Sequence, residues 1–226
     1  MTRGRRRKVD TPRSPRLGYK SDICRTHNRC VLTPTCAFRS GRLDPYHTQV
    51  EFAVKHLGMM TVRGHFSDVT SSGTIDPENP ANSSFEVTID VASIKTHNPQ
   101  RDNDLKSSNF LELEKYPTIT FKSTRIEPAG GDHYTMTGDL TIKGNTRQVT
   151  LPVMRYGEFN DPGMMGHRIA YSAEAQINRK DFGLTMDAFL DGRLVVGNEV
   201  KIQIEVEAVE QKAEAQKEQS AAATRA

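Results

Sequence analysis

The sequence predicts an all-β protein: an extended eight-stranded antiparallel β-barrel with one short helix and a disordered basic N-terminal tail. Two observations favour this fold. Apolar and polar residues alternate over eight segments after residue 43, as they do in half-buried strands. Turn sequences such as Asp76-Pro77, Gly144-Asn145 and Asp161-Pro162-Gly163 separate many of these segments. Strands with one apolar face need a single core, and closure into a barrel also removes exposed sheet edges.

The eight strands are expected over residues 49–56, 62–66, 85–92, 119–122, 134–143, 148–153, 168–177 and 200–207. The third shows the pattern most clearly, since Phe85, Val87, Ile89 and Val91 alternate with Glu86, Thr88 and Asp90. An eight-stranded barrel is wide enough to be filled by its own side chains or to hold one small ligand.

Two segments interrupt the alternation. In the first, Asn98 is a suitable helix cap and Pro99 a suitable first helical residue, which predicts a short helix over residues 99–106. The second runs from Asn178 to Val196 and contains the turn sequence Asp191-Gly192. Both segments lie where the chain leaves a strand, so we expect them at the ends of the barrel.

The net charge of +3 conceals two oppositely charged regions. Residues 1–40 carry 11 Lys and Arg but 2 Asp and Glu, which leaves a net charge of −6 for the remaining residues. We therefore expect a disordered basic tail over residues 1–40, a barrel domain over residues 41–211, and a polar tail over residues 212–226. The acidic body gives no electrostatic reason to bind nucleic acid.

All three cysteines, Cys24, Cys30 and Cys36, lie in the tail, so the body folds without disulfides. The tail contains no apolar run of the length that a secretory signal needs. This favours a cytoplasmic location, with the periplasm as the alternative if residues 1–40 are not native sequence. No stretch approaches 18 consecutive apolar residues, so no membrane-spanning helix is expected.

The sequence offers no recognised catalytic arrangement. It lacks a Gly-x-Ser-x-Gly motif, a phosphate-binding glycine loop and a His-Glu-x-x-His motif. The histidines of the body are scattered, whereas a metal site needs three or four ligands that converge. We expect neither catalytic residues nor a metal site nor a cofactor.

Charged residues in the two interruptions allow two interpretations. Arg101, Asp102, Arg179 and Asp181 could orient a ligand's head group at a barrel mouth. They could equally form a network that holds the helix and the loop to the barrel, which is the more frequent role of such networks. The inward apolar positions are ambiguous in the same way. Gly64, Gly138, Ala173 and Ala175 are small, which favours an open cavity over a filled core.

Several segments, taken in order from about Leu43 to Val209, resemble the YceI-like family of polyisoprenoid-binding, lipocalin-like barrels. They are Asp44-Pro45-Tyr46-His47-Thr48, Thr61-Val62-Arg63-Gly64-His65-Phe66, Arg101-Asp102-Asn103-Asp104-Leu105-Lys106, Asn178-Arg179-Lys180-Asp181-Phe182-Gly183-Leu184 and Val196-Gly197-Asn198-Glu199-Val200. The chain departs from the family at Gly41, where an aromatic residue is common, and at Thr48, where Ser is usual. These departures and the unusual tail suggest a natural start near residue 40.

The resemblance implies a non-catalytic barrel with an apolar tunnel for a long-chain isoprenoid lipid, such as a polyprenyl phosphate or an isoprenoid quinone. The expected lining residues are Val50, Phe52, Val54, Phe66, Phe85, Val87, Ile89, Val91, Phe110, Ile119, Phe121, Met136, Leu140, Val149, Leu151, Ile169, Tyr171, Ala173, Ala175, Phe182, Leu184, Ile202 and Ile204. Arg101, Asp102, Arg179 and Asp181 would frame its mouth.

The leading hypothesis is thus a carrier or store for an isoprenoid lipid. A filled barrel that serves as a stress-response or protein-interaction module is the alternative, and a redox accessory with a cycling quinone is a third reading. The sequence leaves the oligomeric state open, with a homodimer among the expected states.

Overall fold

The computed structural model describes residues 41–76, 79–161 and 163–210. The tails expected over residues 1–40 and 212–226 lie outside the described residues, so their disorder and a natural start near residue 40 stay predictions. Most described residues belong to strands, as the alternation predicts. No helix in this part of the chain combines the length and the apolar composition needed to cross a membrane.

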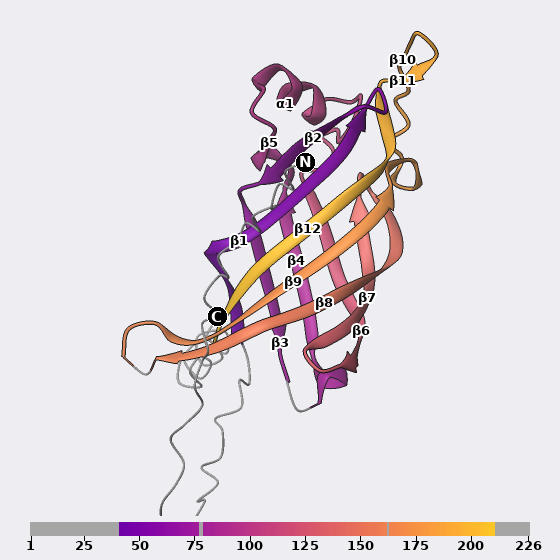
Figure 1. Ribbon diagram of the computed structural model, residues 1–226. Coiled ribbons are helices and arrows are strands. Elements are labelled where there is room, and N and C mark those ends of the chain that lie inside the picture. Colours follow the sequence, from indigo (N-terminus) through magenta and orange to yellow (C-terminus); the bar gives the residue numbers. More distant parts are fainter. Residues whose placement is uncertain (1–40, 77–78, 162, 211–226) are drawn as a thin grey trace, which may run out of the picture. The chain divides into compact units, whose positions relative to one another are not determined.

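Ten described strands form one antiparallel sheet in the order β3-β4-β6-β7-β8-β9-β12-β1-β2-β5, and β10 pairs with β11 in a separate hairpin (Figure 1). Their bounds are β1 Gly41–His56, β2 Met60–Phe66, β3 Val69–Thr74, β4 Ser84–Asp90, β5 Ile94–Lys95, β6 Thr118–Gly130, β7 His133–Ile142, β8 Asn145–Asp161, β9 Gly166–Asn178, β10 Phe189–Leu190, β11 Arg193–Leu194 and β12 Val196–Glu210. The all-β antiparallel class is confirmed, but the expected count of eight strands is too low.

The four strands that the alternation did not reveal are short or lack an apolar face. Strand β3 reads Val69-Thr70-Ser71-Ser72-Gly73-Thr74, with one large apolar residue. Strands β5, β10 and β11 have two residues each, too few to show a period. The predicted strand over residues 85–92 also ends earlier. After Asp90 the chain enters a 3-10 helix, η2 (Val91–Ser93), and the Asp90 side chain accepts a hydrogen bond from the Ala92 backbone N–H at 2.8 Å.

The sheet curls until its first strand, β3, contacts β1 near the other end of the strand order. The backbone N–H of Leu43 donates a hydrogen bond to Ser71 Oγ across this junction, at 3.3 Å. Within the described residues, β1 and β3 form no paired ladder, so side-chain contacts close the curl. The eight-stranded, fully paired ring expected from the sequence is therefore replaced by a curled ten-stranded sheet.

The predicted helix is present as α1 (Pro99–Lys106), and Asn98 caps it as expected. The Asn98 side chain accepts a hydrogen bond from the Arg101 backbone N–H at 3.1 Å. Three 3-10 helices complete the described fold: η1 (Pro80–Asn82), η2, and η3 (Arg179–Phe182). The segment expected to leave the sheet after residue 178 thus begins with η3 and continues into the β10–β11 hairpin. Asp191 and Gly192 form its turn with positive φ values of 49° and 72°.

Two clusters of buried side chains hold the curled sheet together. The larger joins α1, η2 and η3 to the sheet and contains Val91, Ile94, Phe110, Leu111, Ile119, Leu140, Ile142, Phe182 and Leu184. The smaller contains Leu43, Ile169 and Ala208. Further apolar residues of the inner face pack on these clusters but are only partly buried, among them Phe52 and Phe121 on the first and Phe85 and Val206 on the second.

Candidate functional site

A cavity of about 300 Å³ lies inside the curled sheet, and nearly all of its wall is apolar. Most of the expected lining residues border it: Val50, Phe52, Val54, Phe66, Phe85, Val87, Ile89, Phe110, Ile119, Phe121, Met136, Leu140, Val149, Leu151, Tyr171, Ala173, Ala175, Leu184, Ile202 and Ile204. That these side chains contact a ligand stays a prediction. Burial raises the pKa of Tyr171 to about 12, as an apolar surrounding does for a phenol.

Three expected lining residues do not border the cavity. Val91 and Phe182 belong to η2 and η3, and both side chains are buried within the larger core cluster. Ile169 points inward from β9 but is enclosed in the smaller cluster with Leu43 and Ala208. Alternation or composition placed them on the inner face, but neither could distinguish a packed inner position from an open one.

The exposure of the inward side chains shows that the interior is hollow. Four large side chains border the cavity and yet are only partly buried: Phe52, Phe66, Phe121 and Met136. In a close-packed core such side chains would be almost fully enclosed by neighbours. Their remaining accessible surface is the wall of the cavity.

Two of the small residues that suggested a cavity serve a different purpose. A Cβ at Gly64 would lie 2.7 Å from Phe52 Cε1, and a Cβ at Gly138 would lie 2.7 Å from Phe121 Cε2. The aromatic rings occupy the space that these glycines vacate, so Gly64 and Gly138 accommodate rings and leave no empty volume. Ala173 and Ala175 do border the cavity.

Arg179 contributes to the cavity wall, but all three nitrogens of its guanidinium donate hydrogen bonds within the protein. It is 3% exposed and donates hydrogen bonds to the carbonyl oxygens of Leu184, Val196 and Gly197. Its Nη2 also forms a 2.8 Å ion pair with Asp187 Oδ1. Asp187 in turn binds Lys180, and both contacts hold the pKa of Asp187 below its ordinary value. Asp181, the expected partner, is exposed.

Arg101 and Asp102 hold α1 to the end of β5 and do not border the cavity. Arg101 Nε donates to Thr96 Oγ1 at 2.8 Å, and its Nη2 donates to the Thr96 carbonyl at 2.7 Å. Asp102 Oδ1 accepts from the Thr96 backbone N–H at 2.9 Å and from its hydroxyl at 2.5 Å. The geometry of these contacts matches the second interpretation, a network that fixes the helix to the sheet.

Polar groups border the cavity near the β3–β4 connection, which sequence reasoning had treated as a turn. Thr74, Asp76, Ser83 and Ser84 all contribute to the wall there. Asp76 Oδ1 accepts from the Asn79 backbone N–H at 2.9 Å, and Asp76 Oδ2 accepts from Asn82 Nδ2 at 3.3 Å. This end offers hydroxyl and carboxylate groups, whereas the larger core cluster covers the end near α1 and η3.

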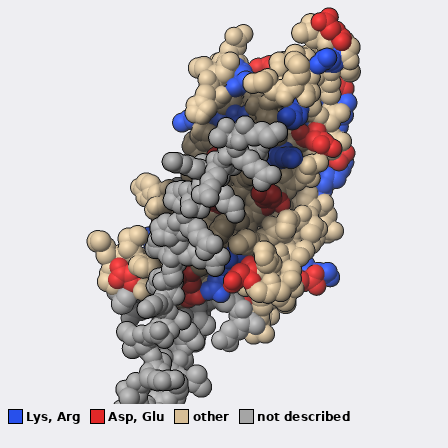
Figure 2. Space-filling view, in the orientation of Figure 1, with Lys and Arg blue, Asp and Glu red and all other residues tan. Residues whose placement is uncertain are grey.

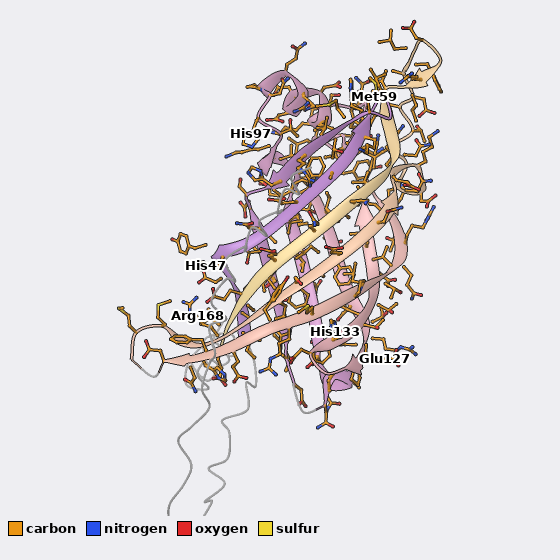
Figure 3. All side chains as sticks on the ribbon, viewed as in Figure 1. His47, Met59, His97, Glu127, His133 and Arg168 are labelled. Carbon is orange, nitrogen blue, oxygen red and sulfur yellow. The ribbon has the colours of Figure 1, made fainter. Side chains whose placement is uncertain are left out.

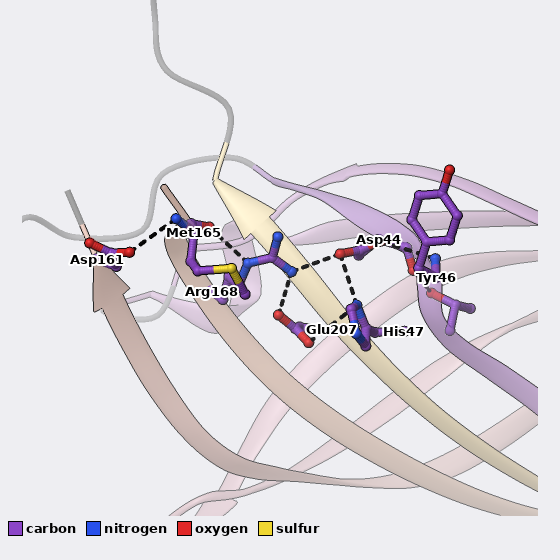
Figure 4. A network of polar contacts seen from close by, with 8 residues as sticks. Asp44, Tyr46, His47, Asp161, Met165, Arg168 and Glu207 are labelled. Atoms are coloured by element: carbon purple, nitrogen blue, oxygen red, sulfur yellow. Dashed lines mark hydrogen bonds and ion pairs between the residues drawn. The ribbon is translucent and has the colours of Figure 1, made fainter. Parts of the chain in front are cut away.

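A network of charged side chains on β1, β9 and β12 was also not predicted from the sequence (Figure 4). Arg168 Nη1 lies 2.7 Å from Asp44 Oδ2 and 2.6 Å from Glu207 Oε1. The Arg168 guanidinium is the main reason why the pKa of Asp44 falls from 3.8 to about 2. Asp44, Glu207 and His47 are close enough to share a cation, but the Arg168 guanidinium already sits between the two carboxylates.

Comparisons with known proteins agree with this geometry. Residues 42–208 match the model of the YceI-like domain family. Protein YceI of Escherichia coli O157:H7 is 39% identical over 166 residues, which cover 74% of this chain and 83% of that protein. A UPF0312 protein of Pseudomonas paraeruginosa is 40% identical over 141 residues, 62% of this chain and 73% of that protein.

Solved structures show the same fold. Burkholderia cenocepacia BcnA superposes with a TM-score of 0.65 at 27% identity and covers 73% of this chain and 98% of its own. The Campylobacter jejuni YCEI protein gives 0.61 at 31% identity, over 70% and 90%. A polyisoprenoid binding domain from Saccharophagus degradans gives 0.55 at 14% identity, over 76% and 99%, and so shares the fold alone. By its sequence and its curled antiparallel sheet, this chain belongs to the YceI-like family.

Proposed function

We propose that this protein is a non-catalytic carrier that holds a long-chain isoprenoid lipid in the cavity of its sheet. The observation that carries the proposal is the cavity itself, whose wall is built from inward apolar side chains left only partly buried. Each CH₂ group moved from water into such a site contributes about 0.8 kcal/mol, so a prenyl chain needs few polar contacts to bind. The Saccharophagus degradans structure, a polyisoprenoid binding domain, shares this fold, so the curled sheet is an architecture that can hold a prenyl chain.

The wall favours a lipid whose head group is uncharged. Among the described residues that border the cavity, Arg179 is the one Lys or Arg, and its guanidinium is occupied by three carbonyls and Asp187. In this part of the chain, a phosphate placed inside would find no free cation on the cavity wall to offset the loss of its hydration. The hydroxyl of Ser84 suits a carbonyl or hydroxyl instead, whereas the Ser83 hydroxyl already bonds to the backbone of Asp76. Of the two expected ligands, an isoprenoid quinone therefore fits better than a polyprenyl phosphate.

Mass spectrometry of an organic extract of the purified full-length protein tests the proposal. We expect a prenyl lipid in stoichiometric amount. A clean extract, followed by failure to take up geranylgeraniol, would contradict the carrier function and favour the alternative of a protein-interaction or stress-response module. The head-group argument is tested separately by comparing geranylgeraniol with geranylgeranyl phosphate, which share one chain. Tighter binding of the phosphate would overturn it and leave the carrier function standing.

A cycling quinone with an oxidoreductase partner stays a third hypothesis, and a quinone in the extract would be its first requirement. The cytoplasmic location also stays a prediction, because neither the fold nor the cavity depends on the compartment.

A further inference from the structure

Three polar side chains come together on the inner face of β7, β8 and β9. Tyr134 of β7 lies directly opposite Val153 of β8, and Tyr171 of β9 lies directly opposite Arg155 of β8. Val153 borders the cavity, and Arg155, two residues further along, lies on the same face of the strand. Directly opposed residues have Cβ atoms roughly 4.5–5.5 Å apart, so side chains as long as these meet. We call Tyr134, Arg155 and Tyr171 the polar cluster.

The polar cluster lies at the end of the cavity that the β3–β4 connection also borders. Tyr134 pairs with Pro128 of β6, and β6 contacts η1, which belongs to that connection. In Figure 3, His133, the residue before Tyr134, lies in the lower half of the view, whereas His97 and α1 lie at the upper end. The polar cluster is therefore at the end opposite the one that the larger core cluster covers.

The hydrogen-bond donors of the polar cluster lack an acceptor in the described part of the chain. Arg155 Nε is enclosed and forms no hydrogen bond there. The hydroxyls of Tyr134 and Tyr171, whose side chains both border the cavity, likewise form none with residues 41–76, 79–161 or 163–210. Enclosed polar groups in folded proteins are nearly always hydrogen-bonded. Three donors beside a cavity therefore indicate an occupant that supplies an acceptor.

Tyr171 is a hydrogen-bond donor at neutral pH. Burial raises the pKa of its hydroxyl to about 12, so the phenol keeps its proton. The Arg155 charge lowers this pKa, whereas Tyr134 and Glu158 raise it. That all three groups act on the Tyr171 hydroxyl agrees with their placement by the strand register.

The charges beside the polar cluster disfavour an anionic head group. Arg155 Nη2 forms an ion pair with Glu158, so its charge is already offset, and the second carboxylate oxygen of Glu158 pairs with His167. A phosphate bound to the cluster would be repelled by the Glu158 carboxylate. On the molecular face drawn in Figure 2, acidic and basic side chains are interspersed, so that face has no basic field to attract a phosphate. The cluster therefore fits an uncharged head group.

Among uncharged groups, a carbonyl oxygen suits the polar cluster best, because it accepts hydrogen bonds and donates none. An alcohol would bring a donor of its own that needs a further acceptor. We propose that the polar cluster binds a carbonyl oxygen of an isoprenoid quinone, with the Tyr171 hydroxyl as the main donor. This assignment rests on the proposed carrier function. It places the quinone ring beside Tyr171 and the prenyl chain along the apolar wall past Ala173.

Equilibrium binding of two ligands to the full-length protein tests this site. One is ubiquinone with a three-isoprene chain, and the other is farnesene, a hydrocarbon of three isoprene units without oxygen. Tyr171→Phe removes the hydroxyl and keeps the ring. We expect its affinity for the quinone to fall about 5–10-fold, the effect of one lost hydrogen bond, and its affinity for farnesene to stay unchanged. Tyr46→Phe is the matched control, because Tyr46 is 91% exposed on β1, and it should bind both ligands as the wild type does.

Infrared spectroscopy of the bound quinone, with isotope-labelled carbonyls, tests the hydrogen bond itself. One C=O stretching band should lie at lower frequency than in an apolar solvent, and Tyr171→Phe should move it back, which a merely structural effect would not do.

Equal quinone affinity and an unmoved band in Tyr171→Phe would overturn the proposal and leave the cluster a site for water alone. A band that responds to Ser84→Ala in place of Tyr171→Phe would also overturn it, because the head group would then lie at the β3–β4 connection. In both cases farnesene uptake by the wild type would leave the carrier function standing. A wild type that binds neither ligand would contradict the carrier function and with it this assignment.

Discussion

Phe52 and Gly64 face each other across β1 and β2, and the ring of Phe52 occupies the space above the glycine. A side chain at residue 64 would meet Phe52 Cε1 and Thr96 Cγ2, each 2.7 Å from the added Cβ. Thr96 is also the residue to which Arg101 and Asp102 bind. The missing side chain at residue 64 thus lets an aromatic ring of the cavity wall pack beside the anchor of α1.

The Gly64→Ala variant should be less stable than the wild type by about 1–3 kcal/mol, the usual cost of overpacking a filled site. Urea unfolding followed by circular dichroism measures the change. Gly157→Ala is the control, because a Cβ at Gly157 would meet nothing within 4 Å. The double variant Phe52→Leu/Gly64→Ala should recover part of the loss, and equal stability of wild type and Gly64→Ala would show that the ring moves freely.

Ala173→Phe should close the cavity and leave the sheet folded. Ala173 borders the cavity and pairs with Val153 and Ile204, so a phenyl group there enters the space proposed for the lipid. We expect uptake of geranylgeraniol to weaken at least about tenfold, equivalent to 1.4 kcal/mol. The same holds for Ala175→Phe. Gln176→Phe places the ring on the exposed outer face of the same strand and should bind normally. Full uptake by a folded Ala173→Phe variant would exclude the cavity as the site.

The Asp44–Arg168 pair should make stability depend on acid pH. The pKa of Asp44 is about 2 in the folded protein and near 3.8 in the unfolded chain, so the folded state favours the ionised carboxylate. This stabilisation is complete above about pH 4 and is lost as the pH falls from there toward 2. Asp44→Asn should therefore flatten the pH dependence of the urea midpoint between pH 4 and 2.5. Asp181→Asn, at an exposed site, should follow the wild type; a parallel Asp44→Asn curve would contradict the assignment.

Arg179→Lys should separate a structural role from a head-group role. Lysine has one nitrogen where Arg179 uses three to reach three carbonyls and Asp187, so we expect a loss of about 2–4 kcal/mol. Uptake of geranylgeraniol per folded molecule should be unchanged. Exposed Arg193→Lys serves as the control and should alter neither quantity. A stable Arg179→Lys variant that no longer binds would restore the mouth interpretation.

The alternation of residues was enough to predict the fold class and each of the eight long strands, because a half-buried strand must alternate wherever one face is packed. Asn98 and Pro99 likewise predicted α1, since capping depends on neighbours along the chain. The inner face of each strand followed from the same period, and with it most of the cavity wall. The strands, the cap of α1 and the inner faces depend on residues close together in the chain, so the sequence pattern alone predicts them.

Contacts between distant segments required the tertiary structure. No residue near Gly64 in the sequence indicates that the Phe52 ring occupies the space beside this glycine. Likewise, no residue near Asp44 indicates that its partner is Arg168 on β9. Arg179 was recognised, but its partner is Asp187, because the chain turns after η3 and brings that carboxylate back. Whether an inward side chain is packed, as Ile169 is, or borders a cavity, as Ala173 does, depends on the curl of the sheet. The sequence by itself determined which residues face inward; the tertiary structure decided which of them meet, because close packing and ion pairing act through space.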